Sequence, residues 1–497
     1  MILKRLATFL VLTSLFLAAA TSRAELRLHG LFSDNMVLQQ GTTVPVWGWA
    51  DDAEVVTVQF RSQKVSAKAR DGKWSVQLWR LKAGGPDVLT VGAKTKTIQF
   101  TNVLVGEVWV CSGQSNMEWP LSKAYQPEAD IAAATNLNIR LFTVPKLKAV
   151  SPTNDVPSAW KECGPQSVTN FSAVACYFGR DLQKARGVPV GLIHTSWGGS
   201  PAEAWVSDTV LRANPRYQKG IIESYENARR QYEEALAKWE ASDKTGKRPG
   251  SPRWKPSELY HGMIAPLIPF AIKGVIWYQG ESNAGRAEQY RTLFPDLIRN
   301  WRRDWREGDF TFLCVQLAPY RAIKPEPGDS AWAELREAQL LATKVLPKVG
   351  MAVITDVGDE KDIHPRKKEP VATRLALAAR HIAYGEPLVY SGPIFRKMDV
   401  KGGKAILYFD NVGSGLEARD GELKGFAVCG ADRKFVWAKA EILPDNTVAV
   451  SSPDVPKPVA VRYGWADCPV VNLWNRNGLP ASPFRTDNFP LTTATQN

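Results

Sequence analysis

The stretch that decides the fold is Val103-Leu104-Val105-Gly106-Glu107-Val108-Trp109-Val110-Cys111-Ser112-Gly113-Gln114-Ser115-Asn116-Met117-Glu118. Residues 103–110 form an apolar run that predicts a buried strand, and the small polar residues after it predict a turn. In open α/β sheets, ligands bind outside the carboxyl ends of the strands. Ser115 is therefore a candidate nucleophile. Met117 stands where Gly-x-Ser-x-Gly would have its second glycine, which disfavours the common α/β-hydrolase elbow.

A serine hydroxyl becomes a nucleophile at neutral pH only when an adjacent base takes its proton. Among the five histidines, His364 has the most suggestive neighbourhood. It lies on a loop between a strand predicted at 349–354 and a helix predicted at 370–380. The same loop carries carboxylates that could hold the imidazole in one tautomer and stabilise its protonated form. These carboxylates are Asp356, Asp359 and Asp362.

Three more strands are predicted at 188–194, 273–278 and 310–317, and each ends in small or polar residues. The first is followed by a turn that contains Gly198, and the second by the segment Gln279–Gly285. Alternating strands and helices from about 101 to 385 predict a parallel sheet, so these loops should meet Ser115 and His364 at one edge. By itself, the glycine pair at 198–199 is equally well explained as an ordinary turn.

Together these motifs resemble those of the sialate O-acetylesterase family, a branch of the SGNH hydrolases. The resemblance implies an α/β fold with a flavodoxin-like, three-layer α/β/α sheet and carbohydrate esterase activity without a metal or cofactor. The matching motifs occur in order from about residue 30 to about 380. They are Phe32–Gln40, Gly113–Met117, Trp197–Ser200, Trp277–Asn283 and Asp362–Pro365.

The resemblance makes Ser115 the nucleophile and His364 the general base. Asp362 would orient His364, although many SGNH enzymes have their acid three residues before the histidine, where this chain has Lys361. Asp359 and Asp356 on the same loop are alternatives, as is a Ser–His pair supported by a backbone carbonyl.

The same resemblance implies an oxyanion hole formed by the backbone N–H groups of Ser115 and Gly198. A side-chain amide, from either Gln279 or Asn283, would complete it. Trp119 and Trp197 are candidates for sugar stacking, as are Trp205 and Trp277, with core packing as the alternative for each. Glu281 is a candidate substrate contact or a buried partner of a backbone amide or Arg286.

The length of 497 residues is too great for one core and predicts about three domains. We expect a signal peptide at 1–24, a β-sandwich-like domain at 25–100, a catalytic domain at 101–385 and a β-rich domain at 386–497. The short, regularly spaced apolar segments of the first domain are typical of sandwiches. A polar helical insertion at about 210–258 interrupts the catalytic domain.

The N-terminus has the features of an export signal. Lys4 and Arg5 precede an apolar run at 6–20, and small residues follow at the positions that a signal peptidase reads. We expect cleavage after about Ala24 and a periplasmic or extracellular protein without a membrane anchor. A retained anchor is the alternative, but the run is short for a membrane span.

Export would expose the six cysteines to an oxidising environment. Their sequence separations allow a pair between Cys163 and Cys176 and another between Cys429 and Cys468, whereas Cys111 and Cys314 are expected to be buried thiols. There is no Cys-x-x-Cys or His-x-x-x-His spacing, so no metal site is predicted.

The formal net charge of +13 raises the question of nucleic-acid binding. The lysines and arginines are scattered, and their densest cluster, at 244–256, has the composition of a solvated linker. We therefore expect no nucleic-acid partner. In an exported protein, such a charge would steer anionic glycans toward the surface.

Three classes of function are consistent with these features. The first is an esterase acting on an acetylated carbohydrate, with sialic acids or plant polysaccharides such as acetylated xylan as substrates. The second is a glycoside hydrolase that pairs Glu281 with Asp356 or Asp359. The third is a glycan-binding protein without catalysis. The serine and histidine motifs favour the first class.

Overall fold

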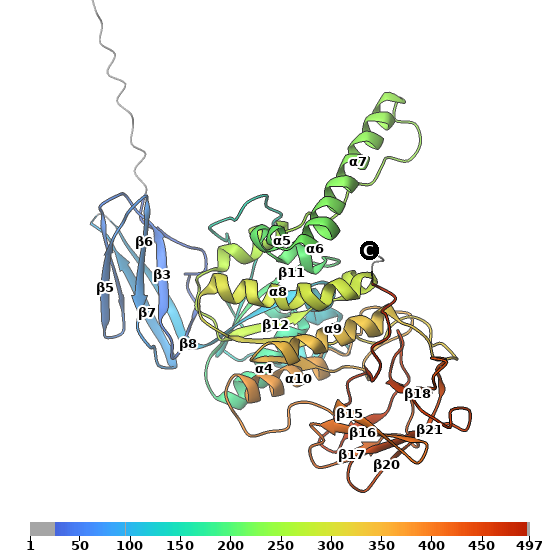
Figure 1. The fold of residues 1–497 in the computed structure, drawn as a ribbon. Coiled ribbons are helices and arrows are strands. Elements are labelled where there is room, and N and C mark those ends of the chain that lie inside the picture. Colours follow the sequence, from blue (N-terminus) through green and yellow to red (C-terminus); the bar gives the residue numbers. More distant parts are fainter. Residues whose placement is uncertain (1–24, 95, 495–497) are drawn as a thin grey trace, which may run out of the picture.

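The computed structural model describes residues 25–94 and 96–494, so the predicted signal peptide at 1–24 lies outside the described residues. A β region comes first, a central α/β body carries one projecting helical arm, and a second β region follows (Figure 1). The α/β class predicted from the sequence is confirmed. Of the helices in the described part, none is long and apolar enough to cross a membrane.

The central sheet has the strand order β10-β9-β11-β8-β12-β13-β14. The neighbours from β9 to β14 are parallel, and only β10 runs antiparallel to its neighbour at the edge. The strands are β8 (Thr97–Gly113), β9 (Ile139–Thr143), β10 (Lys161–Glu162), β11 (Val190–Ser196), β12 (Gly274–Tyr278), β13 (Thr311–Val315) and β14 (Val349–Ala352). With β8 at the centre, the carboxyl ends of β8, β11 and β12 lie side by side.

Helices cover both faces of this sheet because its strands are apolar on both sides. Val108 and Val110 of β8 belong to one hydrophobic core, and Trp109 and Cys111 belong to the other. The first core is completed by α8 (Ala287–Trp305) and α9 (Ala331–Val345), and the second by α4 (Ala173–Arg186) and α10 (Glu369–Ile382). Shorter helical turns are α1 (Ser115–Glu118), η1 (Leu121–Lys123), α2 (Glu128–Ala133), α3 (Pro165–Val168), η2 (Ala202–Trp205), η4 (Tyr260–Ile264), η5 (Ala265–Leu267) and η6 (Glu281–Arg286).

The first β region is continuous with the central sheet through β8. The early residues of this 17-residue strand pair with the antiparallel β7, and its later residues pair with β11 and β12. The predicted border between 100 and 101 therefore falls inside one strand, and the division into domains stays a prediction. The other strands are β1 (Arg27–Leu28), β2 (Val37–Gln39), β3 (Val44–Trp49), β4 (Val55–Phe60), β5 (Gln63–Lys68), β6 (Lys73–Leu78) and β7 (Gly84–Gly92).

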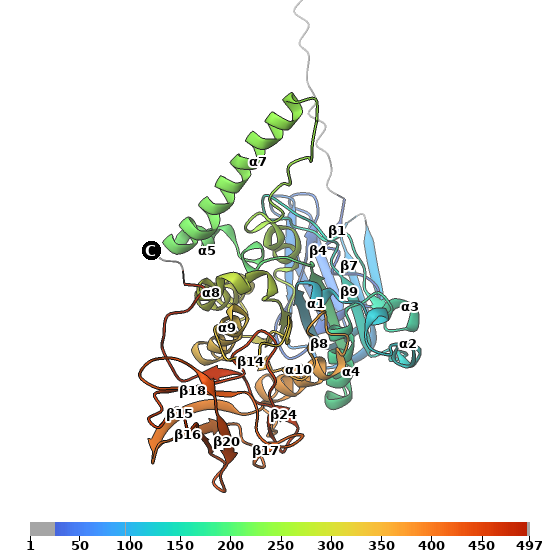
Figure 2. The same cartoon turned by 90° about the vertical axis from the view of Figure 1, so that its right-hand side faces the viewer.

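The insertion forms an arm that projects away from the body (Figures 1 and 2). It begins with α5 (Asp208–Ala213), α6 (Pro215–Tyr217) and η3 (Gln218–Glu223) and continues into α7 (Ser224–Ala241). None of the residues of α7 is buried, as its polar composition predicts. The basic segment after α7 returns to the body.

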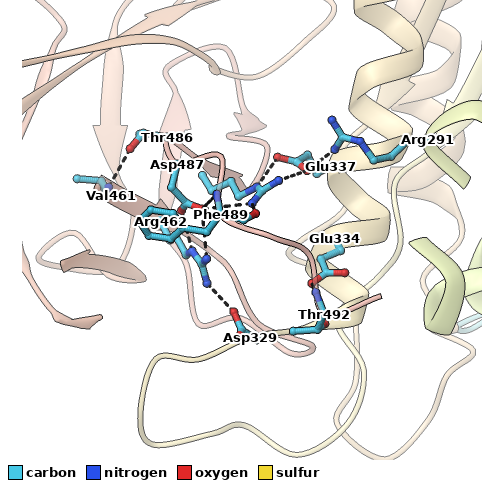
Figure 3. A network of polar contacts seen from close by, with 11 residues as sticks. Arg291, Asp329, Glu334, Glu337, Val461, Arg462, Thr486, Asp487, Phe489 and Thr492 are labelled. Carbon is cyan, nitrogen blue, oxygen red and sulfur yellow. Dashed lines mark hydrogen bonds and ion pairs between the residues drawn. The ribbon is translucent and has the colours of Figure 1, made fainter. Parts of the chain in front are cut away.

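The second β region contains small antiparallel sheets with their own hydrophobic core. Ion pairs join it to α9, where Glu337 pairs with Arg485 of the β region and also with Arg291 of α8 (Figure 3). In these, Arg485 contacts Glu337 and Asp487, and Arg462 also contacts Asp487. The strands are β15 (Ile394–Lys401), β16 (Lys404–Asp410), β17 (Leu416–Ala418), β18 (Phe426–Cys429), β19 (Val436–Trp437), β20 (Lys439–Ile442), β21 (Val448–Ser451), β22 (Ala460–Tyr463), β23 (Leu473–Asn475), β24 (Leu479–Pro480) and β25 (Phe484–Arg485).

The expected disulfides are wrong. All six cysteines lie in the described part of the chain, and all are free thiols. Cys163 and Cys176 come from a loop after β10 and from α4, and sequence proximity alone does not bring two sulfurs into the narrow geometry of a disulfide. Cys111 and Cys314 are buried thiols, as predicted, and burial raises their pKa values.

Candidate active site

A sharp turn at the end of β8 places Ser115 at the first position of α1. Gly113 makes the turn possible because its φ is +143° and a Cβ there would lie 2.2 Å from the carbonyl oxygen of Tyr278. Only glycine fits such a backbone next to another strand. The N–H groups of Met117 and Glu118 donate to the carbonyl of Gln114, whereas that of Ser115, at the first position of α1, has no intrahelical acceptor.

Ser115 and His364 are in direct contact. The distance between Ser115 Oγ and His364 Nε2 is 2.9 Å. The imidazole stacks on the indole of Trp119, with 5.0 Å between the ring centroids and 19° between the planes. The structure therefore brings together the predicted nucleophile and the predicted base, although they are 249 positions apart in the sequence.

Asp362 is the carboxylate beside His364. Its Oδ1 accepts a hydrogen bond from the backbone N–H of His364 at 2.8 Å and lies 3.5 Å from the ring nitrogen Nδ1. Asp359 accepts backbone N–H groups of its own loop instead. Asp356 forms a bidentate ion pair with Arg374 at 2.6 and 2.8 Å. Asp362 thus lies beside the imidazole, as the resemblance implies. The 3.5 Å between its Oδ1 and Nδ1 of His364 is longer than a normal hydrogen bond.

Burial lowers the pKa of His364, and the positive charge of Lys368 lowers it further. Asp362 acts in the opposite direction. The imidazole is consequently neutral at neutral pH, which is the form that can accept the proton of the serine.

Gly198 lies against the serine. A Cβ at Gly198 would be 3.3 Å from Cβ of Ser115. The N–H of Gly198 donates a hydrogen bond of 2.6 Å to Oε2 of Glu118, whose other oxygen accepts from Nζ of Lys146. The predicted oxyanion donor is therefore next to the nucleophile, and a carboxylate of α1 binds it.

The two predicted side-chain donors, Gln279 and Asn283, are engaged elsewhere. Gln279 Nε2 donates to Oδ1 of Asn283 and to the carbonyl of Ser200, at 2.7 and 3.3 Å. Asn283 Nδ2 donates to Glu203 at 2.9 Å. Both side chains are buried and support the loop behind Gly198. The structure does not bring their amides to Ser115.

A cavity of about 570 Å³ opens in front of Ser115 and His364. Trp119 lies on its wall. Trp197 does not line this cavity; it is half-buried, packs edge-on against Trp254 and lies 5.4 Å from Nζ of Lys146, which does line it. Trp205 and Trp277 are fully buried in the core. The prediction that they stack on a sugar is therefore wrong, and core packing, the alternative, is confirmed for both. Other residues that line the cavity are Glu118, Lys123, Lys146, Asn170, His194 and Ser196.

Glu281 is placed behind the serine, away from the wall of this cavity. Its Oε1 accepts a hydrogen bond of 2.6 Å from Asn116 Nδ2. Arg286, the partner considered from the sequence, pairs with Glu203 instead. These contacts fit a structural role for Glu281, as a partner of neighbouring protein groups, better than a role in contacting the substrate.

Sequence reasoning missed several residues around the catalytic pair. Glu118 lies within the motif that identified Ser115, but nothing in the motif shows that its carboxylate reaches Gly198. His194 reaches the cavity from β11, and its pKa is lowered to about 4 by burial, so it is neutral. For Lys368, the only feature of the sequence that could have indicated a role near the site is its position four residues after His364. In residues 25–94 and 96–494, no group of three His, Cys, Asp or Glu side chains forms a metal-binding cluster.

Comparison with known proteins agrees with the site. The family of carbohydrate esterases described as sialic acid-specific acetylesterases matches residues 105–380. Human sialate O-acetylesterase is 30% identical, and the alignment covers 96% of this chain and 95% of the human protein. The chain belongs to the sialate O-acetylesterase family. The mouse enzyme of the same name is also 30% identical, over 92% of this chain and 94% of its own.

A solved structure extends this likeness. A carbohydrate acetylesterase from Xanthomonas citri is 41% identical and superimposes with a TM-score of 0.82, covering 93% of this chain and all of that one. The sialate O-acetylesterase resemblance read from the sequence is thus confirmed. The protein is a carboxylic ester hydrolase of a carbohydrate esterase family.

Proposed function

We propose that this protein removes O-acetyl groups from carbohydrates through an acyl-enzyme formed on Ser115, on a sheet of the SGNH type. The observation that carries the proposal is the 2.9 Å contact between Ser115 Oγ and His364 Nε2 at the carboxyl edge of the parallel sheet. Helices on both faces of that sheet support the SGNH assignment.

The reaction begins when Ser115 Oγ attacks the acetyl carbonyl carbon and His364 Nε2 takes the hydroxyl proton. The tetrahedral intermediate collapses as His364 returns this proton to the departing sugar oxygen, which leaves acetyl-Ser115. A water molecule then attacks the acetyl group, with His364 again as the base. Acetate leaves, and the serine regains its proton.

The backbone N–H groups of Ser115 and Gly198 would stabilise the oxyanion. A single well-placed donor of this kind lowers the barrier by roughly 3–4 kcal/mol. Glu118 has to leave the N–H of Gly198 before the oxyanion can bind there. Gln279 and Asn283 contribute by holding the loop that carries Gly198, through the bond to the carbonyl of Ser200.

Lys146, which lines the cavity, and Lys148, which lies near it beside Trp197, favour an anionic sugar such as a sialic acid. Lys148 Nζ lies 4.3 Å from the ring centroid of Trp254, and Lys146 Nζ lies 5.4 Å from that of Trp197. In the free protein these ammonium groups pair with Glu118 and Glu258, and a sugar carboxylate would replace those partners while the rings pack on the sugar. Acetylated plant polysaccharides are the second substrate class, because the Xanthomonas neighbour is described more broadly as a carbohydrate acetylesterase.

The two other classes of function have less support. A glycosidase needs two carboxylates facing a substrate, but Glu281 binds Asn116 and Asp356 binds Arg374. A glycan-binding protein without catalysis would have no need of a serine hydroxyl in hydrogen-bonding contact with a histidine.

Acetate release tests this proposal. The substrates are p-nitrophenyl acetate, O-acetyl sialic acid, acetylated xylan and acetylated pectin. Ser115→Ala and His364→Ala should each lose activity by at least about a thousandfold. Ser112→Ala, a change in the same segment at a buried residue outside the cavity, should retain it. Parent-like acetate release by Ser115→Ala would refute the assignment.

We also propose export after removal of residues 1–24. N-terminal sequencing of the protein recovered from the periplasm or medium should begin at about Glu25. An intact Met1 on protein that remains in the cytosol would contradict this proposal.

A further inference from the structure

A buried ammonium group lies behind the catalytic pair. Lys368, at the start of α10, is only 1% exposed, and its Nζ donates a hydrogen bond to Oδ1 of Asn116. Lysine is rarely buried so completely because its charge loses solvation, unless partners compensate for that loss. The structure supplies such partners, and they connect Lys368 to both members of the catalytic pair.

The first connection runs through Asn116, the residue after the nucleophile. Its Nδ2 donates to Oε1 of Glu281 at 2.6 Å and to the carbonyl of Ile363 at 3.0 Å. One amide group thus joins the loop after β8, the loop after β12 and the loop that carries His364. Since Ile363 directly precedes His364, the side chain of Asn116 fixes the backbone of the base relative to the serine.

The second connection runs through aromatic rings. Nζ of Lys368 lies 5.8 Å from the ring centroid of Trp119 and 5.3 Å from that of Tyr278. These distances are within the range of cation–π attraction. Trp119 in turn stacks on the imidazole of His364, so the ammonium also holds the ring that orients the base.

We propose that Lys368 is a positioning residue of the esterase: it aligns His364 with Ser115 through Asn116 and Trp119, and its positive charge keeps the imidazole in its neutral, proton-accepting form. This inference rests on the proposed roles of Ser115 and His364. Lys368 contacts neither the hydroxyl of Ser115 nor Nε2 of His364, so it acts on them through Asn116 and Trp119.

The electrostatic part of the inference depends on the charged groups around Lys368. Glu281 faces it from η6, and Asp362 and His364 face it from the preceding loop. Burial lowers the pKa of Lys368 to about 7, against the effect of Glu281 and Asp362. The ammonium is therefore charged below about pH 7, and its positive charge lowers the pKa of His364.

The test compares Lys368→Met with Lys367→Met, a change at the adjacent but exposed lysine. The readout is the pH profile of kcat/KM for p-nitrophenyl acetate. Lys368→Met should lose about 10-fold to 100-fold in activity because the pair is misaligned. The midpoint of its acid limb should rise by about half a pH unit or more, since a neighbouring positive charge has been removed. Lys367→Met should match the parent.

A double variant, Lys368→Met with Glu281→Gln, separates positioning from folding. Removing only Lys368 leaves Glu281 as a buried charge without its partner, which can unfold the protein, whereas neutralising both charges avoids this cost. The double variant should melt close to the parent and keep both the lower kcat/KM and the raised midpoint. A double variant with the parent profile, or an unshifted midpoint in folded Lys368→Met, would overturn the inference. Ser115→Ala in the same assay tests the proposed function separately.

Discussion

The carboxylate of Glu118 binds the backbone N–H of Gly198, with 2.6 Å between Oε2 and the amide nitrogen. Gly198 packs against Ser115, and Lys146 pairs with the second oxygen of Glu118. A negatively charged oxygen thus lies where the proposed mechanism needs a vacant donor for the oxyanion. The two anions cannot share this N–H group, so the carboxylate of Glu118 would compete with the substrate oxyanion at the proposed oxyanion hole.

The first prediction is that Glu118→Gln raises kcat/KM for p-nitrophenyl acetate. A neutral amide accepts the Gly198 hydrogen bond more weakly than a carboxylate does, and the difference of about 1 kcal/mol corresponds to roughly fivefold in rate. Removal of the negative charge also favours the developing oxyanion. Steady-state kinetics at neutral pH measures the change.

Lys146→Met is the companion variant for this prediction. It leaves the carboxylate of Glu118 without its counterion, so Glu118 should compete more strongly for Gly198 and kcat/KM should fall. If Glu118→Gln and Lys146→Met lower kcat/KM to a similar extent, the ion pair has a supporting role and the idea of competition is wrong.

The second prediction concerns pH. The pKa of His364 is lowered from its ordinary value of 6.5, first by burial and then by Lys368. A protonated imidazole cannot accept the serine proton, so kcat/KM should fall as the pH decreases through the lowered pKa, with a midpoint below 6.5. A pH series of kcat/KM for p-nitrophenyl acetate measures that midpoint.

Asp362→Asn provides the opposite shift from Lys368→Met. Asp362 raises the pKa of His364, so its neutralisation should move the midpoint to still lower pH. The shift should be small and should diminish with salt, because Asp362 is half exposed and salt screens exposed charges. An acid limb above pH 6.5 in the parent enzyme would contradict the assignment of this limb to His364.

The sequence was sufficient to predict those parts of the site that depend on strand ends. The strand that contains the apolar run at 103–110 and the strand before the loop of His364 both end at the carboxyl edge of one parallel sheet. The 2.9 Å contact between Ser115 and His364 also requires the loop after β14 to cross the ends of β13 and β12, which separate β14 from β8. Each residue could be found from local signals, and the topology brings them together.

Side-chain direction was the part that could not be predicted. Gln279 and Asn283 carry the expected amide groups, but buried polar groups must satisfy one another, and these two do so with Ser200 and Glu203. The burial of Trp277 likewise depends on which face of β12 meets α8. An apolar strand that is covered on both faces gives no alternation from which to read that choice.

The third prediction concerns the junction between the second β region and the central body (Figure 3). Asp487 is 1% exposed and pairs with Arg462 and Arg485, at 2.9 and 3.2 Å. Asp487→Ala leaves two buried guanidinium groups without this carboxylate and should destabilise the fold by about 3–5 kcal/mol. Urea unfolding, followed by tryptophan fluorescence, measures the loss.

Asp329→Ala is the matched control, because Asp329 also pairs with Arg462 but is 62% exposed. Exposed ion pairs contribute about 1 kcal/mol or less. Equal losses of stability in the two variants would show that burial of the ion pair does not determine its contribution at this junction.

The fourth prediction concerns Glu307, at the opposite end of the central sheet from the catalytic pair. Burial raises the pKa of this carboxyl from 4.5 to about 8. The folded state therefore binds its proton more tightly than the unfolded state, and the stability that this provides is present below pH 4.5 and is lost as the pH rises toward 8. Above about pH 8, the buried carboxyl is ionised in the folded protein, and this stability is absent.

Glu307→Gln should remove this pH dependence, because the amide stays neutral and its oxygen can still accept the N–H of Ile272, 3.2 Å from Oε2 in the parent. The melting temperature of the variant should exceed that of the parent by several degrees at pH 8, because a shift from 4.5 to about 8 corresponds to about 4 kcal/mol at that pH. The two proteins should melt together at pH 4.5. Glu326→Gln, in an exposed loop, should match the parent at both pH values. A gain for Glu307→Gln that is equal at pH 4.5 and pH 8 would show that packing, and not ionisation, is responsible.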